Sequence, residues 1–224
     1  HTVYGGAHLF KADSAHKLGS LALKALHQYA PEPSGFAAVL GVPEKLARVL
    51  YDRVVDKLAR EAVEDFRIDF EDGYGPRPDA EEDAHAVGAA FETAEGLKRG
   101  TLPPFMGIRI KPLNREHAAR AARTLDVYLS TLLRETRGRL PRNFVVTLPK
   151  VAFPEQVLAL ADLLERIERA HVLPSGSVKV ELMLETPSSL FAPDGAAAPR
   201  MLAAAARGRC LSMHLGPYDL TAAF

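Results

Sequence analysis

Short β-type runs, separated by helix-length segments, constrain the fold of this chain more than any other feature of its sequence. After the second run they recur at intervals in the thirties of residues. This alternation implies parallel strands with helices packed outside, either in a closed (β/α)₈ barrel or in an open doubly wound sheet. The six predicted strands are Val3–Ala7, Phe66–Glu71, Phe105–Lys111, Phe144–Lys150, Val178–Glu185 and Cys210–Gly216.

The alternation of side chains within these strands distinguishes the two architectures, because neighbouring residues point to opposite faces of a sheet. One face is apolar and should meet the helices, as in Ile68, Ile108 and Leu182, and the last strand should bury its outer residues Leu211, Met213 and Leu215 in the same way. The other face is polar, with Arg67, Asp69, Glu71, Arg109, Lys111, Thr147, Glu181, Glu185, Ser212 and His214. Strands of an open sheet that is covered on both sides would be apolar throughout.

The sequence therefore predicts an α/β fold of the TIM (β/α)₈-barrel type. Six βα units are visible, and we expect residues 1–224 to form a single barrel domain, truncated after its sixth strand, with its C-terminal part missing. The packing helices should each bury one apolar stripe, as in Leu46, Leu50, Val54 and Leu58.

Composition excludes several classes of partner. The 28 basic and 28 acidic residues leave no net charge, so we expect no nucleic-acid binding. No apolar run approaches the roughly 20 residues of a membrane span, and the single Cys210 allows no internal disulfide. A reducing cytoplasm fits these features. Because His1 stands first, without a leader pattern, we expect a processed or partial chain.

Acidic residues mark the ends of three predicted strands. Asp69, Glu71 and Asp72 precede a Gly-rich turn, Glu185 closes the fifth strand, and Asp219 follows the sixth. Carboxylates in such places hold hard cations or move protons. Taken singly, each also has a simpler interpretation: surface charge for the first group, a cap or ion-pair partner for Glu185, and an Asx turn for Asp219.

Together these acids indicate a cation site. The carboxyl ends of barrel strands meet at one rim, where active sites are built, and neighbouring anions repel unless a cation neutralises them. Carboxylate ligands without a Cys or His cluster favour Mg²⁺ or Mn²⁺ over zinc.

Basic side chains lie on the same face. Arg109, on the third strand, offers a charged fork for a substrate carboxylate or an enolate oxygen, although it could instead form salt bridges with the neighbouring acids. Lys111 and Lys150 also end strands, where lysine is usually solvated. His214 falls short of the rim, and we interpret it as a hydrogen-bonded interior histidine.

Five strand-end motifs follow one another along nearly the whole chain: Phe70–Gly73, Gly107–Ile110, Leu148–Val151, Met183–Pro187 and Leu215–Thr221. In this order they resemble the citrate lyase beta-subunit, malyl-coenzyme A lyase and metal-dependent hydroxy-keto acid aldolase superfamily. Within it, the fuller match is to a citrate-lyase-like branch, and the aldolases are the weaker match because Asp72 stands where they carry a histidine.

The resemblance implies a (β/α)₈ barrel that uses Mg²⁺ to make or break a carbon–carbon bond beside a carbonyl. By the same analogy, Glu185 and Asp219 are the metal ligands and Arg109 grips the substrate oxygen. Glu71 and Asp72 complete the catalytic site.

These assignments predict a Mg²⁺- or Mn²⁺-dependent carbon–carbon lyase or aldolase. Its substrate would be a hydroxy acid or a hydroxyacyl-coenzyme A thioester, cleaved or formed through an enolate, with glyoxylate, pyruvate or oxaloacetate chelated to the metal. Gly216 and Pro217 are assigned to substrate binding, and the family analogy implies a homotrimer or homohexamer.

Two alternatives stay open at this point. The barrel could bind a keto acid or a partner protein without turnover. The acids and Arg109 could also form an interior ion-pair network, in which case a divalent metal would not raise the thermal stability.

Overall fold

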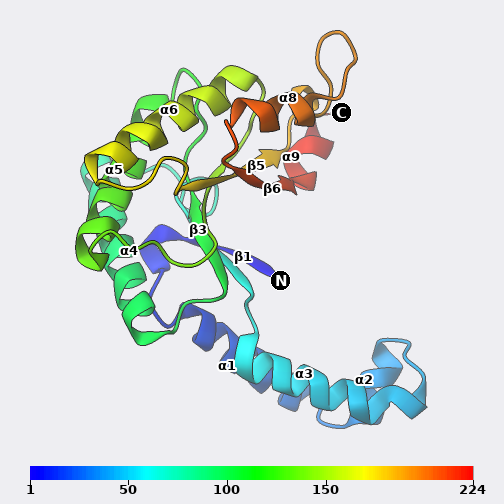
Figure 1. The fold of residues 1–224 in the computed structure, drawn as a ribbon. Coiled ribbons are helices and arrows are strands. Elements are labelled where there is room, and N and C mark those ends of the chain that lie inside the picture. The colour runs from blue at the N-terminus through cyan, green and yellow to red at the C-terminus, as the bar shows by residue number, and fades with distance from the viewer. Residues whose placement is uncertain (224) are drawn as a thin grey trace.

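The computed structural model describes residues 1–223, and strands alternate with helices along them as the sequence predicts (Figure 1). All six predicted strands are confirmed, although several end one or two residues early. Glu71 and Lys150, for example, lie just beyond their strands, because their N–H groups bond to the carboxylates of Asp69 and Glu185. The strands are β1 Thr2–Gly6, β2 Asp65–Asp69, β3 Phe105–Arg109, β4 Phe144–Leu148, β5 Lys179–Leu184 and β6 Cys210–Leu215.

Helices fill the segments between the strands. Within residues 1–223, none of them combines the length and hydrophobicity that a membrane crossing requires. They are η1 Ala7–Leu9, α1 Ser14–Tyr29, α2 Pro33–Val39, η2 Glu44–Leu46, α3 Ala47–Glu61, α4 Asp79–Arg99, α5 Ala118–Thr136, α6 Pro154–Ala170, α7 Pro187–Leu190, α8 Ala198–Ala205 and α9 Pro217–Ala222.

The six strands form one parallel sheet in the order β1-β2-β3-β4-β5-β6. Because every connection returns to the next neighbouring strand in the same direction, the sheet is wound in one sense only. This is the strand order of a TIM-type barrel rather than of a doubly wound sheet, in which the order reverses.

Contacts across the sheet show that it curls. In a flat sheet, β1 and β5 would lie about 19 Å apart, four strand spacings. Yet the Tyr4 hydroxyl of β1 lies 3.3 Å from the Glu181 carboxylate of β5. Tyr4 also packs against His214 of β6, with ring centroids 5.6 Å apart. The polar faces of the strands therefore line the concave interior, as predicted, and His214 lies inside.

The apolar faces of β2 to β5 point outward and are buried beneath α4, α5 and α6 (Figure 1). Ile68, Ile108, Val146 and Leu182 are completely buried, which confirms the predicted pattern.

The last strand differs from this prediction. Leu211, Met213 and Leu215 do point away from the interior, but they are 56%, 37% and 56% exposed. The expected burial is wrong for β6, because nothing among residues 1–223 covers its outer face in the way that α4 to α6 cover the other strands.

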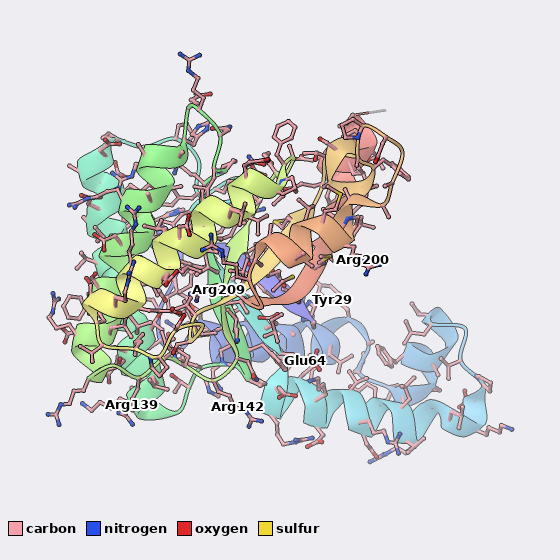
Figure 2. The ribbon with its side chains drawn as sticks, turned by 45° about the horizontal axis from the view of Figure 1, so that its top comes forward. Tyr29, Glu64, Arg139, Arg142, Arg200 and Arg209 are labelled. Atoms are coloured by element: carbon pink, nitrogen blue, oxygen red, sulfur yellow. The ribbon has the colours of Figure 1, made fainter. Side chains whose placement is uncertain are left out.

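Helices α1, α2 and α3 form an arm that extends beyond the sheet (Figure 1). The predicted stripe of α3 is only partly buried: Leu46 is 44% exposed, and Leu50, Val54 and Leu58 are half-buried. The reason is that α3 packs against α1 and α2. Tyr29, at the end of α1, is 80% exposed (Figure 2).

Candidate active site at the carboxyl ends of the strands

A buried ion pair forms the floor beneath the rim. The Arg67 guanidinium of β2 donates from Nε and Nη2 to both oxygens of Glu181, at 3.2 and 3.1 Å. Thr147 and Ser212 each donate to the same carboxylate at 2.9 Å. Burial alone would raise the pKa of Glu181, but the charge of Arg67 outweighs it and holds the pKa below its ordinary value. Glu181 therefore joins strands β2, β4, β5 and β6 through one ionised group.

Asp69, at the end of β2, positions the next layer. Its completely buried carboxylate accepts bonds from Arg109 Nε at 2.7 Å and Arg109 Nη2 at 2.5 Å. It also accepts the N–H groups of Glu71 and Gly73, at 2.9 and 2.8 Å. A Cβ on Gly73 would lie 2.6 Å from the Asp69 carboxylate, so this close approach requires glycine. Asp69 thus holds both Arg109 and the acidic loop.

Arg109 is fixed on its remaining sides. The Tyr4 ring lies beneath its guanidinium, 4.7 Å from centroid to Cζ, and Nη1 donates to Met183 Sδ at 3.7 Å. The same Nη1 lies 3.2 Å from Glu71 Oε2. Burial disfavours the charged form, but the bonds to Asp69 outweigh it, and the pKa of Arg109 is raised. Arg109 is therefore a permanent, oriented cation whose Nη1 faces the rim.

Glu71 and Asp72 approach one cation, Lys150, at the end of β4. The Lys150 Nζ is paired with Glu71 and lies 3.0 Å from Asp72 Oδ2. Burial raises the pKa of Glu71, whose Oε2 accepts no hydrogen bond. Asp72 is more exposed, and although burial acts in the same direction, its bond with Lys150 lowers its pKa. The two adjacent acids are therefore electrostatically different.

Glu185, just after β5, and Asp219, in the first turn of α9, also contact Lys150, but through different groups. Glu185 Oε1 accepts the Lys150 N–H at 2.6 Å, and Asp219 Oδ2 lies 3.1 Å from Lys150 Nζ. Burial, followed by the negative charge of Asp219, raises the pKa of Glu185. A Cβ on Gly216 would lie 2.6 Å from Glu185 Oε2, which explains the glycine, while Pro217 opens α9 on the surface.

The strand-end acids singled out from the sequence thus meet at one rim beside Arg109. Within residues 1–223, no group of three or more His, Cys, Asp or Glu side chains is arranged to hold a metal ion. A metal on Glu185 and Asp219 would therefore rest on two protein ligands.

Sequence reasoning missed the part that Lys150 plays. A lysine at a strand end is expected to be solvated, yet Lys150 contacts the rim acids. Lys111 turns outward instead, to the Glu82 carboxylate at 2.6 Å and the Phe70 carbonyl at 2.8 Å. The signal lies in the register: because Leu148 pairs with Leu182, Lys150 falls level with Leu184, next to Glu185 on the neighbouring strand. What the register does not reveal is which way a lysine after a strand turns.

This chain is similar to two solved structures of Haloferax volcanii malate synthase. The pyruvate/acetyl-CoA ternary complex has 18% sequence identity and a TM-score of 0.49, over 71% of this chain and 41% of that chain. The lead(II) complex has 17% identity and a TM-score of 0.47, over 71% and 43%. The chain thus spans less than half the length of these enzymes.

Curated proteins give no significant match to the sequence. The family model described as "Domain of unknown function (DUF6986)" matches residues 1–224. The chain belongs to the DUF6986 family.

Proposed function

We propose that this chain is a metal-dependent carbon–carbon lyase or aldolase, with Mg²⁺ or Mn²⁺ held by Glu185 and Asp219. The observation that carries the proposal is that both carboxylates contact Lys150, Glu185 through its backbone N–H and Asp219 through its ammonium, while Arg109 approaches the neighbouring Glu71. The earlier resemblance to the citrate lyase and malyl-coenzyme A lyase superfamily supports the same chemistry.

The two acids suit a hard cation. Magnesium commonly binds through one or two carboxylates and keeps several waters, so it does not need a complete cage of protein ligands. Glu185 is held at Oε1 by the Lys150 N–H, and Gly216 leaves space beside Oε2. Burial raises the pKa of Glu185 and the negative charge of Asp219 adds to this, so a positive charge beside the two acids is favoured.

The bound ion would polarise the carbonyl of a 2-oxo acid such as glyoxylate, pyruvate or oxaloacetate. In the cleavage direction, a hydroxyl proton leaves and the carbon–carbon bond breaks, with its electron pair moving into the neighbouring carbonyl to give an enolate. Arg109 Nη1, facing the rim, is placed to stabilise the enolate oxygen. Because Asp69 and Tyr4 already hold Arg109, this stabilisation requires little reorganisation.

Glu71 and Asp72 would complete the proton transfers. Glu71 is buried and its pKa is raised, which suits a group that takes up and returns a proton. Gly216 and Pro217 would border the substrate next to Asp219. The substrate is a hydroxy acid or a hydroxyacyl-coenzyme A thioester, and the active assembly is a homo-oligomer.

The first test measures metal binding directly. We expect Mn²⁺ to bind the purified protein, detected as loss of the free-ion signal in electron paramagnetic resonance. Glu185→Gln and Asp219→Asn should each weaken binding at least about tenfold, because each removes a charged ligand. Asp162→Asn, on the exposed side of α6 and paired with Arg207, is the matched control and should bind as the wild type does. Equal affinities in all four proteins would exclude this metal site.

The second test measures turnover. Purified protein with Mg²⁺ and a panel of hydroxy acids and acyl thioesters should release a 2-oxo acid, followed by NMR. Retained keto-acid binding without product from any member of the panel would instead indicate a binding protein.

A further inference from the structure

Lys150 contacts each of the four acids at the rim. Its Nζ is paired with Glu71 and lies 3.0 Å from Asp72 and 3.1 Å from Asp219. Its backbone N–H donates to Glu185 at 2.6 Å. One residue therefore links groups that come from the ends of β2 and β5 and from the first turn of α9.

An unusual backbone conformation makes this possible. Lys150 has φ +50°, in the left-handed region that residues with a side chain seldom adopt. It lies two residues after the end of β4, so the chain leaves the strand with the Lys150 N–H and the Lys150 ammonium both directed at the rim. Residues held in such a conformation cluster at functional sites, where the surrounding contacts maintain them.

The charges at the rim show what the ammonium does. Arg109 forms two bonds to Asp69, so much of its charge is balanced below the rim. The Lys150 ammonium therefore supplies the short contacts to Asp72 and Asp219, and it shares Glu71 with Arg109. The ammonium supplies the positive charge that the acids would otherwise lack.

We propose that the Lys150 ammonium is an internal competitor for the divalent cation. It holds the rim acids together in the metal-free protein, and it must leave Asp219 when the ion binds there. A magnesium ion bound 2.0–2.1 Å from Asp219 Oδ2 would lie within a few ångströms of the ammonium that contacts the same oxygen at 3.1 Å, and two cations repel strongly at such short range. This inference rests on the proposed metal site.

The test compares Lys150→Met with the wild type. Methionine keeps the backbone N–H that holds Glu185 and an unbranched side chain, but it removes the charge. We expect the dissociation constant for Mn²⁺, and for Mg²⁺ by displacement, to fall about tenfold or more, since a positive charge a few ångströms from the ion is lost. Lys111→Met removes a lysine that pairs with Glu82 outside the rim, and it should leave metal affinity unchanged.

Thermal unfolding provides a second readout that does not depend on activity. Without metal, the Lys150→Met protein should unfold at a lower temperature than the wild type, because Glu71, Asp72 and Asp219 have lost the ammonium that contacts them. Added Mg²⁺ should raise its unfolding temperature by more than it raises that of the wild type. Lys150→Gln, which also lacks the charge, should behave in the same way and guards against a packing defect specific to methionine.

The outcomes separate the two hypotheses. If the wild type binds metal and Lys150→Met binds it equally or more weakly, the competition is overturned while the metal site stands. If neither protein binds Mn²⁺ or Mg²⁺, the proposed metal site and the competition are both overturned.

Discussion

Glu181→Ala should destabilise the protein far more than a typical single substitution. The Glu181 carboxylate accepts bonds from Arg67, Thr147, Ser212 and Tyr4, on four other strands. Alanine would remove this carboxylate and leave the Arg67 guanidinium, which is only 3% exposed, without its main partner. Removing one member of a buried ion pair costs about 3–5 kcal/mol of unfolding free energy.

Matched variants separate the charge from the packing. Glu181→Gln keeps an acceptor and most of the volume, so it should cost less, about 1–3 kcal/mol. Replacing both Arg67 and Glu181 by Met removes the two charges together. This double variant should be more stable than Glu181→Ala, since the 3%-exposed Arg67 charge is no longer left unpaired, while the Asp65 carboxylate that loses Arg67 is 19% exposed.

Urea unfolding followed by circular dichroism measures these differences, as a shift in midpoint at constant m-value. The reasoning is refuted if Glu181→Ala costs under about 1 kcal/mol, the ordinary scale of an exposed pair. It is also refuted if the double variant is no more stable than Glu181→Ala. Either result would mean that β2 and β5 do not meet across the interior, and the curled sheet itself would be in doubt.

Two further predictions concern the packing of the barrel. Burial tends to raise the pKa of Glu168, but the Arg209 bonds at 2.6 and 2.8 Å outweigh it and hold the pKa below its ordinary 4.5. The stability that this ion pair contributes is complete above pH 4.5 and is lost as pH falls through the lowered pKa of Glu168. Urea unfolding at a series of acid pH values should therefore show the difference in unfolding free energy between the wild type and Glu168→Gln shrinking over this range. A difference that stays constant would contradict this reasoning. Gly107→Ala should cost about 1–3 kcal/mol in the same unfolding assay, because its Cβ would overlap the Val145 carbonyl oxygen. Gly88→Ala is the matched control, because a Cβ at this position on α4 would meet no atom within 4 Å, and it should stabilise the protein by about 0.5–1 kcal/mol. Equal effects of the two glycine substitutions on unfolding free energy would argue against the close approach of β3 and β4.

The elements of this fold could be predicted from local sequence because their signals are local. Apolar and polar residues alternate within each strand, and helix-length segments separate the strands, so six parallel strands and an inward polar face follow from periodicity. Local signals place the ends of elements less precisely. Asn114 is a residue type that often caps helices, yet Asn114 Oδ1 accepts the N–H groups of Glu116 and His117 in a turn, and α5 begins only at Ala118.

Several properties depend on contacts that local sequence does not contain. The exposure of Leu211 and the packing of α3 in the arm are set by which elements lie alongside, and that depends on the whole chain path. Neither could be predicted from an apolar stripe alone, since the stripe specifies a face and not what covers it.

For the candidate site, the sequence by itself determined which acids end the strands, because strand ends and residue types are both written locally. Only the tertiary structure decided which cations balance the charges of these acids. Arg109 donates to Asp69, and Lys150 turns inward to Asp219, while Lys111 turns away from the rim to Glu82. The physical reason is that electrostatic pairing acts through distances in space, and the curl of the sheet brings together side chains that lie far apart along the chain.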